Sequence, residues 1–376
     1  STVAFNLATL RTGRARIERV AVDGADVDAI VDDQTVLVAL PVPLVPQQTT
    51  TVSIVYRGRL AADASVDGDA WEFARIGDIL TAYRWIPWLS RTTPFDRPSV
   101  GDPWVTASSP SVRVSIETDQ PVVIASSGVL VRNAGAAHVF EAADVRDFNF
   151  AASPSYRTVS EDVAGTTVSV FYKTLSPDRI LATASRALRD FSAKIGPFAH
   201  RQLTIAEIGP WAPIESPGHF WIPDNAGRLL SWMVAHEVAH QWFYSAVGSD
   251  QAREPFADEA LSDYMARDLI SSFVPSQCRE ARLDHTIYDI GDCYAWVVYV
   301  QGDSWLRRIH RRSGNSRFWA ALAGYYRAHR GGIGGTYEVL ASLAAAAGTP
   351  AADYDRFPLT FPARVICMPF GPAVRR

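Results

Sequence analysis

One short motif constrains this chain more than any other feature: the sequence HEVAH from His236 to His240, which Glu259 follows after eighteen further residues. On a helix, His236 and His240 lie one turn apart on the same face, so both imidazoles can bind one metal ion. Two histidine nitrogens and one carboxylate oxygen leave tetrahedral zinc with one open position, which is typical of a catalytic site. Glu237 lies beside the place where a water on that position would sit. The pattern predicts a zinc hydrolase with one Zn²⁺ per chain.

An alternative places the two histidines in the core of a buried helix, with Glu237 as a solvated neighbour. The stretch from Arg228 to Val247 is apolar enough for such a helix. Burying two imidazoles and a carboxylate in one turn without partners costs free energy, however, and a metal ion supplies the missing partner. This alternative therefore describes mainly a degenerate site that no longer turns over.

The composition is that of an ordinary globular protein. The chain has 376 residues, 48% hydrophobic and 20% charged, which is enough for two or three domains with their own cores. Its net charge is −4, and the sequence holds no cluster of Lys or Arg that favours nucleic acid or an anionic membrane. No apolar run approaches the roughly eighteen residues that cross a bilayer. We expect neither a nucleic-acid partner nor a membrane span in this chain.

The three cysteines are Cys278, Cys293 and Cys367, and none has the CxxC spacing of a cysteine-based zinc site. Cys278 and Cys293 lie in a loop-like stretch and are close enough in sequence to close a small loop, so we predict a disulfide between them. Such a bond persists only in an oxidising compartment, which favours a secreted or cell-surface location over a cytoplasmic one. In a cytosolic enzyme the same cysteines would be free thiols.

Hydrophobic periodicity divides the chain into a β-rich first part and a mainly helical remainder. Short alternating runs separated by turn residues predict these strands: 16–22, 35–40, 50–56, 111–117, 122–129 and 148–152. The pattern changes near Ser153 to Ser160. Beyond it we predict strands at 167–172 and 203–208, and helices at 180–191, 228–247, from about 254, 303–312, 316–329 and 336–346. Gly209 to Asn225, rich in Pro and Gly, is predicted to be a loop that carries Glu215.

Several segments together resemble the gluzincin aminopeptidases, the aminopeptidase N-like family. His236 to Trp242 resembles the zinc helix of that family, and Asp258-Glu259-Ala260 with Tyr264 resembles its Asn/Asp-Glu-Gly…Tyr stretch. Further matches are 187–198, similar to the helix and turn before the family's substrate strand; 299–302, similar to its Tyr-x-Lys-Gly; and 16–58, similar to later strands of its saddle-shaped β domain.

The resemblance implies an α+β multidomain fold. An N-terminal β saddle-like domain, residues 1–155, precedes a thermolysin-like, mainly helical zinc peptidase domain, residues 156–376. The opening strands of the saddle and the family's large C-terminal helical domain have no counterpart in the sequence, so we expect a short form.

The resemblance also assigns roles to residues. His236, His240 and Glu259 bind zinc, and Glu237 is the general base that takes a proton from the zinc-activated water. Tyr299 donates to the oxyanion of the tetrahedral intermediate, with Tyr294 as the fallback.

Glu215 is implied to bind the free α-ammonium of the substrate, which makes the enzyme an aminopeptidase acting on peptides with a free N-terminus. The family's Gly-x-Met-Glu-Asn strand is represented here by residues 212–216, and Pro213 removes a backbone N–H that could bind the substrate. The alternative is that Glu215 is an exposed loop carboxylate without a functional role. Asp258 and Asp263 are expected to support the ligands or face solvent. His219 is expected at the pocket wall or the surface.

Two other functions stay open. One is a gluzincin of different specificity, either an endopeptidase or an epoxide hydrolase, which a comparison of free and blocked amines would distinguish. The other is a non-catalytic binding module stabilised by zinc.

Overall fold

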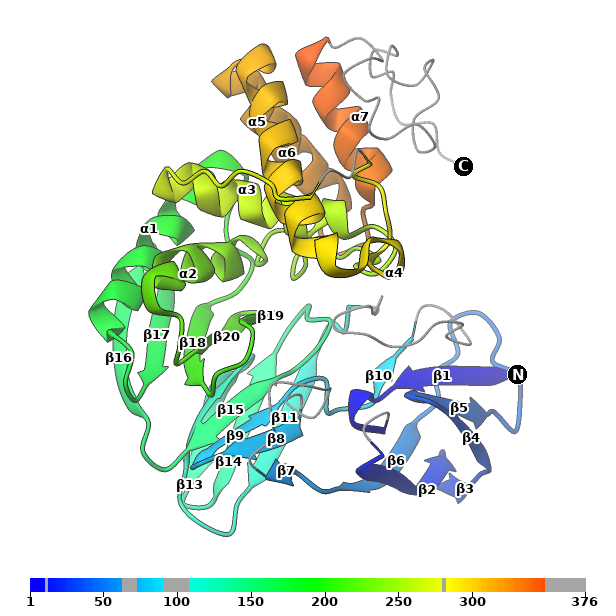
Figure 1. Cartoon of the computed structure of the whole chain (residues 1–376). Helices are drawn as coiled ribbons and strands as arrows, with labels where there is room; N and C mark the ends of the chain where they lie inside the picture. Colours follow the sequence, from blue (N-terminus) through cyan, green and yellow to red (C-terminus); the bar gives the residue numbers. More distant parts are fainter. Residues whose placement is uncertain (11–12, 63–72, 91–107, 279–281, 349–376) are drawn as a thin grey trace.

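The computed structural model describes residues 1–10, 13–62, 73–90, 108–278 and 282–348 (Figure 1). Figure 1 shows a β-rich N-terminal part and a helical part that is built on a sheet of its own. Within the described ranges, no helix combines the length and the apolar character that crossing a bilayer requires.

Among the described residues, four small sheets make up the β-rich part. One has the order β10-β1-β5-β4 and a second the order β3-β2-β6; the larger third sheet is β12-β15-β9-β8-β7, and the fourth is β11-β14-β13. The strands are β1 (Thr2–Asn6), β2 (Ala15–Val22), β3 (Ala25–Asp26), β4 (Ala29–Asp32), β5 (Thr35–Ala39), β6 (Val52–Gly58), β7 (Ala61–Ala62), β8 (Phe73–Ile76), β9 (Ile79–Ala82), β10 (Trp88–Leu89), β11 (Val112–Glu117), β12 (Val123–Ser126), β13 (Val129–Ala134), β14 (Ala137–Ala142) and β15 (Phe150–Ser153).

Local sequence explains the hairpins of this part. Asp23 and Gly24 join β2 to β3 with φ of 49° and 84°, the left-handed pair that a tight hairpin turn requires. Val20 and Val22 of β2 and Val36 and Val38 of β5 are buried together in one apolar cluster. The run predicted as one strand over 122–129 is two strands, because the chain turns between Ser126 and Val129.

A five-stranded sheet carries the helical part. Its strands are β16 (Arg157–Val163), β17 (Thr166–Tyr172), β18 (Gln202–Ile208), β19 (Ile214–Ser216) and β20 (His219–Pro223), in the order β16-β17-β18-β20-β19. The predicted loop over 209–225 is therefore wrong in part, since β19 and β20 form an antiparallel pair. Both strands are short, and Pro217-Gly218 separates them. β20 is buried throughout, so the pair does not show the alternation of half-buried strands.

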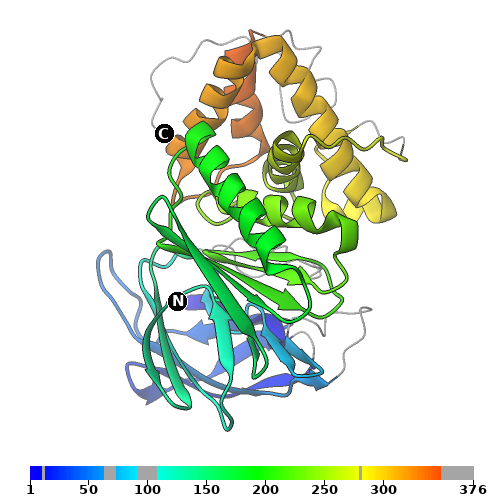
Figure 2. The same cartoon turned by 90° about the vertical axis from the view of Figure 1, so that its left-hand side faces the viewer.

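Helices cover one face of this sheet and the β-rich part covers the other (Figures 1 and 2). The helices are α1 (Pro177–Lys194), α2 (Leu230–Ala239), α3 (Glu259–Ile270), α4 (Ile287–Ile290), α5 (Gly302–Ser313), α6 (Asn315–His329) and α7 (Thr336–Ala347), with a π-helical segment at Ala295–Gln301. Between the sheets, Trp221 of β20 packs in one cluster with Tyr83, Ala125 and Ala151 of the β-rich part.

Two predicted helices have different bounds in the structure. α2 ends at Ala239, not near Val247, because the chain turns back after His240 and Ser245 N donates to His240 O at 2.9 Å. The residues beyond it stay buried, which explains their apolar pattern. α3 begins at Glu259, not near Glu254, since Pro255 opens a separate 3₁₀ turn that ends at Ala257.

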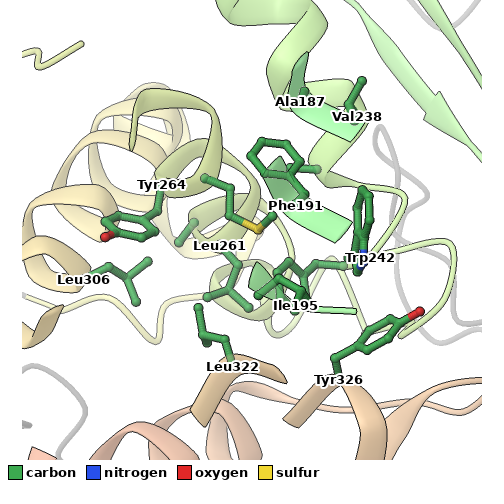
Figure 3. Packing of buried hydrophobic residues seen from close by; sticks show 14 of the residues in the cluster. Ala187, Phe191, Ile195, Val238, Trp242, Leu261, Tyr264, Leu306, Leu322 and Tyr326 are labelled. Carbon is green, nitrogen blue, oxygen red and sulfur yellow. The ribbon is translucent and has the colours of Figure 1, made fainter. Parts of the chain in front are cut away.

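One large core unites the helices (Figure 3). Phe191 of α1 lies edge-on to Trp242, with ring centroids 5.8 Å apart. Leu261 of α3, Leu306 of α5 and Leu322 of α6 join the same cluster and are fully buried. Each such side chain contributes about 1.5–3 kcal/mol by leaving water, so the core holds the helix that carries the HEVAH motif and its neighbours rigidly.

The chain passes from the β-rich part to the sheet of the helical part between Ser153 and Arg157. The division into domains at residues 155 and 156 stays a prediction.

Candidate metal centre and substrate site

Three ligand atoms meet where α2 ends and α3 begins. His236 lies in the last turn of α2, His240 caps that helix, and Glu259 is the first residue of α3. His236 Nε2 lies 2.9 Å from His240 Nε2 and 3.1 Å from Glu259 Oε2. His240 Nε2 lies 3.4 Å from the same carboxylate oxygen. The structure thus brings together the three residues predicted to bind zinc.

The separations of these atoms fit a tetrahedral zinc ion. With bonds of about 2.0–2.2 Å, such an ion holds its ligand atoms about 3.3–3.6 Å apart. The His240–Glu259 separation of 3.4 Å lies in this range, and the other two, 2.9 and 3.1 Å, are slightly shorter. All three side chains are largely buried. Two nitrogens and one carboxylate oxygen, taken out of water and directed at one point, are a donor set that zinc accepts.

Asp258 fixes the orientation of His240. Its Oδ1 lies 2.7 Å from His240 Nδ1, and Phe243 O and Ser262 Oγ each lie 3.2 Å from that nitrogen. Acceptors at Nδ1 place the ring proton there, which leaves the lone pair of Nε2 for a metal. Asp258 is fully buried, so it supports a ligand and does not face solvent.

Asp263 occupies a similar place behind His236. It is fully buried, and its carboxylate accepts from Trp232 Nε1 at 2.7 Å and from Arg267 Nε at 2.6 Å. Its Oδ1 lies 4.0 Å from His236 Nδ1, a buried nitrogen that has no hydrogen-bond partner among the described residues. Asp263 therefore directs negative charge at the back of this ring.

The local charges favour a cation at the three ligand atoms. Burial lowers the pKa of His236 despite its contact with Glu259, so this imidazole is neutral, as a ligand must be. Burial also acts to lower the pKa of His240, but the carboxylates of Glu215, Asp258 and Glu259 outweigh it and raise that pKa well above its usual range. The same negative charge favours a metal ion at this imidazole in place of the extra proton.

Glu237 lies inside this group but is not one of the three converging ligands. A carboxylate oxygen of Glu237 lies within 4.8 Å of a ring nitrogen of both His236 and His240. The side chain is only 2% exposed. The carboxylate is thus next to the position at which a metal ion would hold a water molecule.

Tyr299 approaches the candidate metal ligands from the π-helical segment. Its ring stacks on His236, and Tyr294 packs edge-on against Tyr299 with ring centroids 5.9 Å apart. Burial raises the pKa of Tyr299 well above its usual range, and the charge of Glu259 raises it further. The phenol therefore keeps its proton and can donate a hydrogen bond.

A close helix contact explains the glycine three residues after Tyr299. A Cβ added at Gly302 would lie 2.7 Å from Cβ of Ala260, the residue after Glu259. Small side chains at both positions let α5 and α3 approach each other. This contact sets the distance between the segment that carries Tyr299 and the helix that carries Glu259.

The predicted disulfide between Cys278 and Cys293 is present. It closes a loop immediately before the π-helical segment. Gln301, the last residue of that segment, donates from Nε2 to Cys278 O at 3.0 Å and to Ser276 Oγ at 3.1 Å. The disulfide loop thus supports the π-helical segment that carries Tyr299.

Glu215 lies on β19, the edge strand of the sheet, and is 4% exposed, so it is not an exposed loop carboxylate. One of its carboxylate oxygens lies within 4.8 Å of a ring nitrogen of His240 and of a carboxylate oxygen of Asp258. Gln251 Nε2 donates to Glu215 Oε1 at 3.0 Å, and Arg84 lies behind Gln251. Sequence reasoning missed Gln251 and Arg84, since neither belongs to a motif.

His219 is a core residue and not part of the pocket wall or the surface. Its side chain is fully buried in β20. Its Nδ1 lies 3.0 Å from Thr204 O, and its Nε2 accepts from Trp221 Nε1 at 2.9 Å. Both ring nitrogens are therefore occupied by contacts that stabilise the sheet.

At the level of sequence, no protein-family model and no curated protein matches this chain. Solved structures do match its fold. One is a mutant M1 zinc metallopeptidase from Deinococcus radiodurans bound to a Tyr-Ser-Ala substrate. Its TM-score is 0.69 and its identity 17%, over 94% of this chain and 84% of that one.

Two longer proteins are similar as well. Legionella pneumophila aminopeptidase A, in complex with aspartic acid, has a TM-score of 0.67 and 13% identity over 93% of this chain and 44% of its own. Yeast LTA4 hydrolase, in complex with bestatin, has a TM-score of 0.65 and 16% identity over 100% of this chain and 64% of its own. The expected short form stays a prediction. The predicted arrangement of an N-terminal β part and a helical part is confirmed, and the chain has the fold of the M1 zinc metallopeptidases.

Proposed function

We propose that this chain is a zinc-dependent aminopeptidase that hydrolyses the N-terminal peptide bond of peptides with a free N-terminus. The observation that carries the proposal is the position of Glu215. This buried carboxylate lies within 4.8 Å of a ring nitrogen of His240, and its charge raises the pKa of both His240 and Tyr299. A protonated α-amine bound there would bring only the first peptide bond to the metal.

His236, His240 and Glu259 would hold the zinc ion. When bound, zinc lowers the pKa of a coordinated water towards about 7 and polarises the scissile carbonyl. The residues around the site do the remaining work.

Glu237 acts as the general base. It accepts a proton from the attacking water and returns it to the leaving amine, a role that requires a carboxylate within reach of both. Tyr299 is the oxyanion donor. Its ring stacks on His236, and its hydroxyl keeps its proton beside Glu259, from where it would donate to the carbonyl oxygen as negative charge develops there.

The similar structures support peptides as substrates. The Deinococcus protein was crystallised with a tripeptide substrate, and the Legionella protein is an aminopeptidase. Pro213 precedes β19 directly and offers no N–H, so a substrate has fewer backbone contacts here than the family's usual strand provides.

The test compares a free peptide with its N-acetylated form, on protein with measured zinc content. We expect one zinc per chain, cleavage of the free peptide and none of the acetylated one. Glu215→Gln should raise KM for the free peptide and keep the zinc, while Glu117→Gln, on the exposed face of β11, should change neither. Cleavage of acetylated or internal sites would indicate an endopeptidase. Zinc without any turnover would indicate a binding module.

We also infer a secreted or cell-surface location, because the Cys278–Cys293 disulfide requires an oxidising compartment to persist. Mass spectrometry of protein from its native host, alkylated before reduction, tests this. Two alkylated cysteines at 278 and 293 would contradict it.

A further inference from the structure

Glu215 is the end of a chain of buried polar contacts that leads into the β-rich part. Gln251 Nε2 donates to Glu215 Oε1 at 3.0 Å, and Gln251 Oε1 accepts from Arg84 Nη2 at 3.4 Å. The three side chains are 4%, 5% and 6% exposed. We propose that Gln251 is a positioning residue that orients the Glu215 carboxylate for the substrate α-ammonium, and that Arg84 fixes Gln251 for this task. The inference rests on the proposed function.

The chemistry of the three groups allows only one arrangement. A guanidinium only donates hydrogen bonds and a carboxylate only accepts them, so the group between them must present an acceptor to one and a donor to the other. The side-chain amide of Gln251 does both. Its oxygen therefore faces Arg84 and its NH₂ faces Glu215. A glutamate would place a second negative charge against Glu215, and an apolar residue would contact neither group.

Strand β19 is also held through the side chain of Ser216. Ser216, the residue after Glu215, donates from Oγ to Asp147 Oδ1 at 2.6 Å and accepts from Asn149 Nδ2 at 2.9 Å. Asn149 Oδ1 in turn accepts from the backbone N–H of Arg84 at 2.6 Å. Glu215 is thus fixed both through its side chain and through its neighbour. Both routes include Arg84, whose Nη2 also donates to the Tyr244 hydroxyl at 3.1 Å.

Fixing the carboxylate in advance has a consequence for binding. A glutamate side chain loses rotamer freedom when it binds a ligand, and that loss subtracts from affinity. A side chain already held by Gln251 loses less. Since Arg84 follows β9 and Asn149 precedes β15, affinity for the amine depends on how the β-rich part packs on the sheet that carries β19.

The test uses two inhibitors on the zinc-loaded protein, with binding measured by calorimetry. L-leucine hydroxamate carries an α-amine, and isocaproyl hydroxamate is the same molecule without it. Gln251→Leu keeps the volume and removes the hydrogen bonds. We expect this variant to weaken the binding of L-leucine hydroxamate about 10-fold or more, the loss typical for a hydrogen bond to a charged group. The binding of isocaproyl hydroxamate should be unchanged. Gln120→Leu, on the exposed surface, should affect neither.

Equal weakening of both inhibitors, or of neither, would overturn the role of Gln251. Arg84→Lys keeps the charge but loses the forked donor, and should also weaken only L-leucine hydroxamate. If Arg84 acts through Gln251, the double variant should bind no more weakly than Gln251→Leu alone; additive losses would overturn the order of the chain. Should the wild-type protein bind both inhibitors equally, the proposed role of Glu215 fails as well, which is a different result from failure of Gln251 alone.

Discussion

The phenol ring of Tyr299 lies parallel to the imidazole of His236, with ring centroids 5.4 Å apart and an interplanar angle of 16°. This packing holds the Tyr299 ring against a candidate metal ligand, and a phenylalanine can reproduce it. We expect Tyr299→Phe to keep zinc and stability, and to lower kcat by about 10²–10³ with little change in KM, the usual loss for one oxyanion donor. Steady-state kinetics with metal analysis checks this. Tyr294→Phe is the matched control, and the same loss in that variant alone would reassign the donor.

Glu237→Gln should separate metal binding from proton transfer. The amide keeps the volume of the carboxylate but cannot take a proton, so zinc content should be unchanged while turnover falls by about 10²–10⁴. His236→Ala and Glu259→Ala, which remove converging ligands, should instead lose zinc and activity together. Metal analysis of the dialysed proteins distinguishes the two classes. An active Glu237→Gln protein would exclude the general-base role.

Removing the disulfide should lower turnover without removing zinc. Gln301 at the end of the π-helical segment donates to Cys278 O, so a released loop would let Tyr299 leave its stacked position. We expect Cys278→Ser and Cys293→Ser each to reduce kcat while the zinc content stays at one per chain. Cys367→Ser, outside the described residues, is the control for loss of a thiol. Unchanged kcat in both single variants would show that the loop does not support Tyr299.

Gly302 and Ala260 should be coupled. An alanine at position 302 would place its Cβ 2.7 Å from Cβ of Ala260, and overpacking of this kind costs about 1–3 kcal/mol. Gly302→Ala should therefore lower both the free energy of unfolding and kcat. The double variant Gly302→Ala with Ala260→Gly relieves the contact and should recover much of both quantities. Denaturant unfolding and kinetics of the four proteins form a double-mutant cycle, and additive effects would contradict the coupling.

His200 should make the protein less stable in acid. Burial and then the charge of Arg330 lower the pKa of His200 to about 4, with partial opposition from Asp144. In the unfolded chain the pKa is about 6.5, so between these values the unfolded state binds more protons and stability rises with pH. The loss on going from about pH 6.5 to 4 amounts to up to about 3 kcal/mol.

Denaturant unfolding at several pH values measures that slope. His200→Gln, which can keep a contact with Ser245 Oγ, should flatten the dependence between about pH 4 and 6.5. His329→Gln, at a partly exposed position, is the control. An unchanged slope in His200→Gln would assign the acid sensitivity to other groups.

The sequence was informative where function and periodicity coincide in a short span. The HEVAH spacing predicts two ring nitrogens on one helix face, and the structure places them 2.9 Å apart. The end of α2 was not predictable from apolar residues, because Trp242 and Val247 stay buried in turns as they would in a helix. Periodicity reports burial, and burial does not end where hydrogen bonding changes.

The contacts of Glu215 could not be predicted from the sequence for a different reason. Arg84 and Gln251 are separated by 167 positions and meet only because two sheets pack face to face. Nothing local marks either residue, since a buried arginine and a buried glutamine look like surface residues in a single sequence. Long-range polar contacts of this kind follow from tertiary packing, which no short motif encodes.

β19 is three residues long and lies at the edge of its sheet, directly after Pro213. An extended peptide laid beside it could form few backbone hydrogen bonds before it met the proline. If a peptide is held mainly at its first residue, the following residues make few contacts that could select one sequence over another. The enzyme would then be tolerant of sequence downstream of the cleaved bond, and its selectivity would be that of a trimming enzyme rather than of a processing enzyme.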